Sequence, residues 1–71
     1  MERQIVKSRI LRSMGYDESI KILEIEFQNN LIYQFLDVPP KVYRELLRSD
    51  EIGKYFTDKV RNRFRTKQVV A

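Results

Sequence analysis

The residues best suited to chemistry in this sequence are basic ones near its C-terminal end. Positions 59–71 hold five basic residues and no acidic residue, and the five are Lys59, Arg61, Arg63, Arg65 and Lys67. Arginine forms paired hydrogen bonds to phosphate and stacks on bases, so several together favour a phosphate-bearing partner such as RNA. Cations at the C-terminal end of a helix also stabilise that helix through its dipole, which explains the same run without a ligand.

Tyrosines interleave with further basic residues, as they do on surfaces that bind nucleotides by stacking and charge together. Tyr16 and Tyr43 are predicted to be half-exposed rings whose hydroxyls reach water. With Arg12 they complete the candidate nucleic-acid-binding residues. A domain this small fills its core with the large residues it has, so the core is predicted to take Phe27, Tyr33, Phe35 and Phe56.

Catalysis is not predicted. The sequence contains no histidine and no cysteine, which removes the commonest general base, the commonest metal ligand and the thiol nucleophile. Glu24 and Glu26 resemble a carboxylate pair, but alternation along a strand with one face in solvent explains them more simply. We therefore expect no cofactor, no metal site and no small-molecule substrate.

Charge is distributed unevenly along the chain. The net charge of +4 divides into +3 over residues 1–12, −4 over the middle of the chain and +5 over residues 59–71. Basic ends on a mildly acidic body favour an anionic partner. Basic ends also serve simply to keep a protein dissolved, and the sequence leaves this alternative open.

Length and hydropathy set the class of protein. The 71 residues predict a single domain with its core in residues 6–65. No apolar stretch approaches the ~20 residues that a membrane-spanning helix needs, and residues 1–5 lack the order of a signal peptide. A cytoplasmic location without membrane contact is the expectation.

The first half of the chain predicts three strands. Residues 6–16 form the first, with a bulge between Leu11 and Met14 that lets both face inward. Residues 20–27 form the second, and Asn29-Asn30 suits a tight turn because asparagine tolerates positive φ. Residues 31–36 form the third, ending before two prolines that cannot donate to a strand ladder.

The second half predicts two helices. One starts at Pro40, which suits a first helical turn, and ends near Arg48. The other follows Ser49 and ends near Arg65, because its apolar residues recur every four positions as Ile52, Phe56, Val60 and Phe64. Residues 66–71 are predicted to be a frayed tail. The fold class is α+β: a three-stranded antiparallel meander followed by two helices on one face (β-β-β-α-α).

An ordered set of short motifs runs through residues 6–64. Its members are Ser8, Leu11, Gly15-Tyr16-Asp17, Leu23 to Phe27, Tyr33-Gln34-Phe35, Val38-Pro39, Val42-Tyr43, Leu46, Gly53, Tyr55-Phe56, Val60 and Phe64. In this set the chain resembles the KTSC domain, a short module at the C-terminus of some lysyl-tRNA synthetases that also occurs as free-standing small proteins. The central Tyr-x-Tyr of that family stands here as Tyr33-Gln34-Phe35, which removes one phenolic hydroxyl.

The resemblance implies no catalytic residues, and it implies RNA binding only through the family's association with a synthetase. Two hypotheses follow. The first is a non-catalytic module that binds RNA, of the kind of tRNA, through its basic residues. The second is a protein-interaction module or homodimer that pairs through an exposed edge of the sheet.

Overall fold

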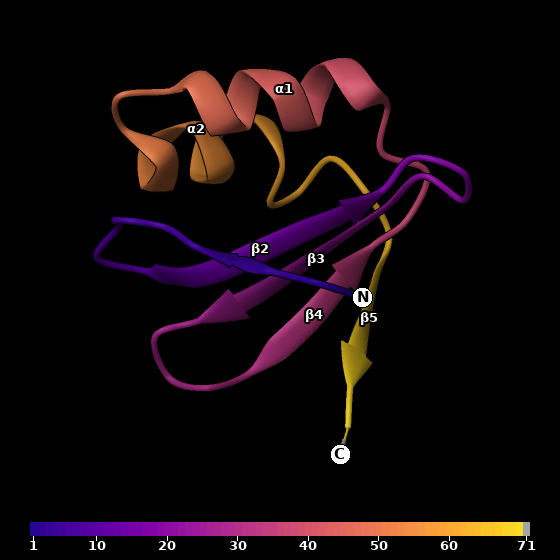
Figure 1. The fold of residues 1–71 in the computed structure, drawn as a ribbon, viewed down its shortest axis with the longest axis horizontal. Helices are drawn as coiled ribbons and strands as arrows, with labels where there is room; N and C mark the ends of the chain where they lie inside the picture. Colours follow the sequence, from indigo (N-terminus) through magenta and orange to yellow (C-terminus); the bar gives the residue numbers. More distant parts are fainter. Residues whose placement is uncertain (71) are drawn as a thin grey trace.

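The chain folds as an antiparallel sheet with two helices on one side of it (Figure 1). The structure is a computed structural model and describes residues 1–70. In chain order the elements are β1 (Gln4–Ile5), β2 (Leu11–Asp17), β3 (Ile22–Phe27), β4 (Ile32–Phe35), α1 (Pro40–Arg48), α2 (Ile52–Lys59) and β5 (Thr66–Val69). The strands lie in the sheet in their chain order, and each neighbouring pair is antiparallel. The α+β class is confirmed.

The prediction places three strands before the two helices in the correct order, but the number of strands is wrong, because the sheet has five. The predicted strands correspond to β2, β3 and β4, whereas β1 precedes them and β5 follows the helices. Residues 66–69, expected to fray, form β5, and residue 71 lies outside the described residues. The physical reason is that β4 would otherwise present an unpaired row of N–H and C=O groups. β5 pairs with that row, placing Thr66 opposite Phe35 and Val69 opposite Ile32.

Two local predictions in the strands are confirmed. The pairing of β2 with β3 shifts register between Leu11 and Ser13, so a bulge at Arg12 lets both Leu11 and Met14 be buried. In the turn between β3 and β4, Asn30 takes a φ of 70°, the left-handed conformation that asparagine tolerates.

The first helix is confirmed and the second is shorter than predicted. α1 covers Pro40 to Arg48 with proline in its first turn. α2 ends at Lys59, so a helix reaching Arg65 is wrong. After it, the Arg61 amide donates to the Phe56 carbonyl. The chain then turns and returns along β4. Pairing of β5 with β4 therefore outweighs the four-residue spacing of apolar residues that predicts a helix as far as Arg65.

The core lies between the helices and the sheet. Strands β2 to β4 contribute one face, the segment before α1 contributes a valine, and the two helices with the residue after α2 contribute the rest. The buried set is Leu11, Met14, Leu23, Ile25, Phe35, Val38, Leu46, Phe56 and Val60. Phe27 and Tyr33, predicted to be core residues, pack against this set but are only partly buried.

The opposite face of the sheet carries a polar network. Glu24, expected to reach solvent, is only 5% exposed. The guanidinium of Arg3 pairs with its carboxylate, and the Gln34 side chain donates to it at 2.9 Å. Arg3 also donates to Ser13 at 3.0 Å. The expectation is wrong because β1 brings Arg3 across this face.

Gly15 sets how closely the N-terminal segment approaches the sheet. A Cβ built on Gly15 would lie 2.0 Å from the carbonyl oxygen of Glu2, a distance that no side chain tolerates. A side chain at this position would force the backbone before β1 away from β2.

Replacing this glycine tests the placement of β1. We expect Gly15→Ala to lower the free energy of unfolding by about 1–3 kcal/mol, because backbone atoms must move to make room. Chemical denaturation measures this change. Gly53→Ala is the matched control, because its Cβ would meet side-chain atoms of Ser8 and Ile10 and alanine favours a helix. Equal stability of Gly15→Ala and the wild type would show that Glu2 does not lie against Gly15.

The network predicts a pH-dependent contribution of Arg3. Burial raises the pKa of Glu24, but hydrogen bonds from Gln34 and Arg3 and the charge of Arg3 outweigh it, so the net pKa is lowered. The stabilisation is therefore present above the unfolded pKa, about 4.3, and is lost as pH falls through the lower folded value. We expect Arg3→Met to destabilise the fold by about 1–3 kcal/mol at neutral pH, with a smaller gap near pH 3.

The control for that measurement is Lys41→Met. Its ion pair with Glu45 spans 3.8 Å between two exposed side chains, and such pairs contribute little. Urea denaturation across the pH range measures both variants. A gap between the wild type and Arg3→Met that does not depend on pH would contradict a stabilising charge on Glu24.

Candidate functional site

The eight predicted nucleic-acid-binding residues do not form one surface. The basic run, residues 59–67, holds five of them, on the end of α2, the turn after it and β5. Arg12 lies at the bulge in β2, where its side chain donates to Asn30 at 2.6 Å. Tyr16 and Tyr43 lie together on β2 and α1.

The helix-dipole explanation covers only a small part of the basic run. Lys59 is the basic residue in the last turn of α2. Arg61 and Arg63 follow the helix end, and both are exposed. Because the dipole effect is confined to the last turn, it does not account for these arginines. Arg65 lies 3.5 Å from Asp37, but both side chains are about four-fifths exposed, so the pair is weak.

Lys67 lies on the face of the sheet that carries the polar network. In the register of β4 with β5 it lies opposite Gln34, whose side chain contacts the Glu24 network on the outer face of the sheet. Thr66, its neighbour, lies opposite Phe35 on the core side. Alternation along β5 therefore separates Lys67 from the face on which Arg61 lies.

The tyrosine pair is engaged in holding the fold. The rings of Tyr16 and Tyr43 stack with centroids 4.9 Å apart and planes 18° apart. The Tyr16 hydroxyl donates to the carbonyl of Val38, which precedes α1. Burial, followed by the neighbouring Glu18 carboxylate, raises the pKa of Tyr16, while the charge of Arg44 opposes them.

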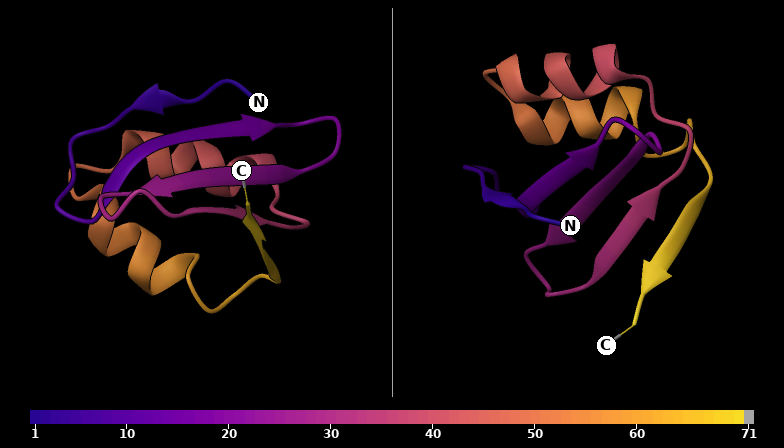
Figure 2. Two further views of the ribbon diagram at one scale, coloured as in Figure 1. Left: turned by 90° about the horizontal axis from the view of Figure 1, so that it is seen from below. Right: turned by 45° about the vertical axis from the view of Figure 1, so that its right-hand side comes forward.

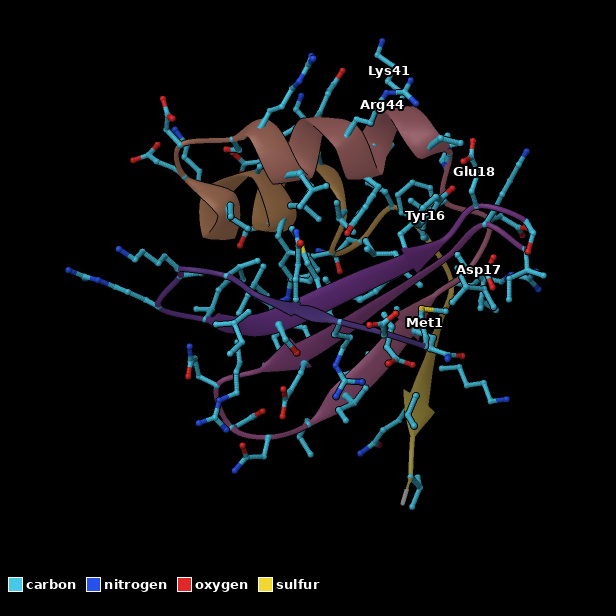
Figure 3. All side chains as sticks on the ribbon, in the orientation of Figure 1. Met1, Tyr16, Asp17, Glu18, Lys41 and Arg44 are labelled. Carbon is cyan, nitrogen blue, oxygen red and sulfur yellow. The ribbon has the colours of Figure 1, made fainter. Side chains whose placement is uncertain are left out.

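Figure 3 shows Tyr16 between the end of the sheet and α1, with Arg44 and Lys41 directed outward above it. Burial also raises the pKa of Tyr43. This pair ties β2 to the start of α1, and its members are motif residues of the resemblance described above. The pair is better explained by structure than by binding.

Aromatic side chains and Arg61 surround a hollow at the edge of the core. This Tyr33 hollow, about 260 Å³, is lined by Phe27, Tyr33, Phe35, Phe56, Arg61, Asn62 and Thr66. Phe27 lies edge-on to Tyr33, with ring centroids 5.8 Å apart, and edge-on to Phe56 at 5.5 Å. In the right-hand view of Figure 2, β5 and the start of β4 lie away from the two helices, so this part of the sheet has no helix above it.

A second hollow adjoins the first. This Arg9 hollow, about 300 Å³, is lined by Arg9, Ile10, Phe27, Gln28, Asn29, Phe56 and Arg61. Neither hollow has a carboxylate in its lining. Arg9, Phe27 and Tyr33 are residues that the sequence analysis does not place in a site. The predicted pairing of residues 20–27 with residues 31–36 could have indicated that Phe27 and Tyr33 share a site, because it puts both rings at the same end of the sheet.

A third hollow, about 620 Å³, lies between the segment before β2 and the start of α2. Its lining includes the carboxylates of Asp50, Glu51 and Asp58 together with the cations of Lys7, Arg9 and Lys54. The three acidic and three basic side chains balance, so the lining of this hollow carries no net charge.

Other kinds of site find no support in residues 1–70. No group of three potential metal-ligating side chains is found there. Glu24 is tied into the outer-face network, which accounts for its position without a catalytic role. None of the helices in the described part of the chain is both long and apolar enough to cross a membrane.

Comparison with known proteins identifies the family. The family model of the KTSC domain matches residues 7–64. A protein of Stutzerimonas stutzeri is 43% identical over 56 residues, covering 79% of each chain. The crystal structure of a KTSC domain protein from Yersinia pestis superposes with a TM-score of 0.94 at 29% identity, covering 97% of each chain.

A lysine–tRNA ligase of Nostoc punctiforme also contains a similar segment. It is 25% identical over 60 residues, which is 84% of this chain and 11% of the ligase. The motifs from Ser8 to Phe64, the matched residues and the superposed fold agree, and the chain belongs to the KTSC domain family.

Proposed function

We propose that this protein is a non-catalytic module that binds RNA through the Tyr33 hollow and the Arg9 hollow. The observation that carries the proposal is the position of Arg61, which borders both hollows beside the half-buried ring of Phe27. Stacking on aromatic rings and contact with arginine are the two means by which proteins hold single nucleotides.

Charge around the hollows supports an anionic ligand. Arg9 and Arg61 border them, and Arg63 follows Arg61 by two positions on the same turn. All three side chains are exposed. Exposed cations beside hollows whose own linings hold no carboxylate raise the local concentration of a polyanion and speed its encounter.

The similarity to part of a lysine–tRNA ligase supports RNA as that polyanion. That enzyme, by its name, acts on a tRNA, and a module that binds RNA would help such an enzyme to hold its tRNA. In a free-standing protein the same module would act in the cytoplasm, where tRNA-like RNA is present. The family match itself brings no catalytic role.

The alternative partner is a second copy of the chain, joined through an edge of the sheet. The edges are β1, with two residues, and β5, with four. Short edge strands and an edge lysine such as Lys67 are features that discourage edge-to-edge pairing. The edges therefore favour this partner less than the hollows favour RNA.

Binding to a tRNA transcript tests the proposal. We expect wild-type affinity to fall steeply between about 50 mM and 200 mM salt, because phosphate contacts release counterions. Arg61→Ala should weaken binding about tenfold and reduce the salt slope by about one, since it removes one charged contact. Fluorescence anisotropy at several salt concentrations measures both effects.

Arg44→Ala is the matched control, because it removes an exposed arginine from α1 beside the tyrosine pair. Its affinity should stay close to that of the wild type. Absence of tRNA binding at low salt would overturn the proposal, and a larger loss in Arg44→Ala than in Arg61→Ala would move the site to α1. Light scattering over a range of concentrations tests the second-copy alternative directly.

A further inference from the structure

The two hollows are neighbours that share a wall. Phe27, Phe56 and Arg61 line both of them. Each has a volume of about 260–300 Å³, several times the ~30 Å³ share of one water. Pockets that hold a whole small molecule start near roughly 300 Å³. Two adjoining hollows of this size suit a ligand made of repeated flat units better than one compact molecule.

The two hollows differ beyond the shared wall. The Tyr33 hollow has the Tyr33 ring on its side and the polar side chains of Asn62 and Thr66 at its rim. The Arg9 hollow has a second cation, Arg9, and the amide of Gln28.

Gln28 also shapes the rim of the Arg9 hollow. Its side-chain nitrogen donates to the carbonyls of Ser8 and Leu11, at 3.2 and 3.1 Å. These bonds tie the residue after β3 to the segment before β2 and to the first residue of β2. The rim is therefore held in place before any ligand arrives, which lowers the cost of ordering it on binding.

We infer that the two hollows take two successive unpaired bases of a single strand, with the phosphate between them on Arg61. This inference rests on the proposed function and names its substrate class. Among residues 1–70, Arg61 is the only cation that lines both hollows, so it is placed for the group that joins two bases. A guanidinium forms paired hydrogen bonds with such a phosphate.

Base pairing prevents this mode of binding. Bases inside a duplex are stacked on each other and paired, so their faces are not free to enter a hollow. A duplex offers only its phosphates to the arginines, which gives attraction that depends on salt but no contribution from stacking. A marked preference for single strands is therefore expected.

A length series tests the number of bases held. Adenylate oligomers of one, two, three and four nucleotides are competed against a labelled single-stranded octamer. We expect affinity to rise at least about fivefold from one nucleotide to two, because each stacked base contributes roughly 1–3 kcal/mol. The third and fourth nucleotides should each add less than twofold. Equal steps along the whole series would overturn the two-base inference.

A substitution in the Tyr33 hollow tests whether the second base binds there. Tyr33→Leu keeps an apolar side chain but removes the ring that lines only the Tyr33 hollow. It should bring the dinucleotide close to the affinity of the mononucleotide and leave the mononucleotide unchanged. Tyr43→Leu is the control, because it removes an equivalent ring from the stacked pair with Tyr16 and should not alter the series. Thermal unfolding of both variants confirms that they are folded at the temperature used.

Competition by a blunt RNA duplex of eight base pairs distinguishes failure of the two-base inference from failure of the proposed RNA binding. Competition at least tenfold weaker than that of the single-stranded octamer supports the inference. Equal competition by the duplex overturns the inference and leaves RNA binding standing. Binding of neither RNA at low salt overturns the proposed function itself. An unchanged length series in Tyr33→Leu would show that the second base lies outside the Tyr33 hollow.

Discussion

Pairing of β5 with β4 is the constraint that determines where the basic residues lie. Once Thr66 is opposite Phe35, the chain between Lys59 and Thr66 must leave α2, reverse and approach the end of β4. The Leu36 amide donates to the Arg65 carbonyl at 2.9 Å and extends this pairing beyond the strand. Arg61 therefore lies beside aromatic residues of the sheet. A longer α2 would have distributed the arginines around a helix in solvent.

A small core explains the exposed aromatic surface. Two short helices cover part of one face of a five-stranded sheet (Figure 2), and Phe27 and Tyr33 pack against the core while staying only partly buried. The other face of the sheet carries a polar network, in which Arg3 neutralises the charge of the buried Glu24. The proposed binding surface and the internal ion pair are thus on opposite sides of the sheet.

Patterns with a local cause could be predicted from the sequence, and those set by tertiary pairing could not. Alternation, turn chemistry and Pro40 correctly give β3, the Asn30 turn and α1. β5 was missed because Thr66–Val69 is short and follows a basic run, and only the free edge of β4 gives it a reason to be a strand. The sequence singles out the arginines by residue type alone. Their placement beside Phe27 depends on that missed strand.

The central claim is that the turn after α2 and the aromatic end of the sheet form one RNA-binding surface. Amide chemical shifts of the isotope-labelled protein, followed as single-stranded RNA is added, test it most directly. The account predicts that the largest shifts come from Phe27, Asn29, Tyr33, Arg61 and Thr66, which line the two hollows. Largest shifts at Tyr16 and Tyr43, or an even spread over both faces of the sheet, would contradict it.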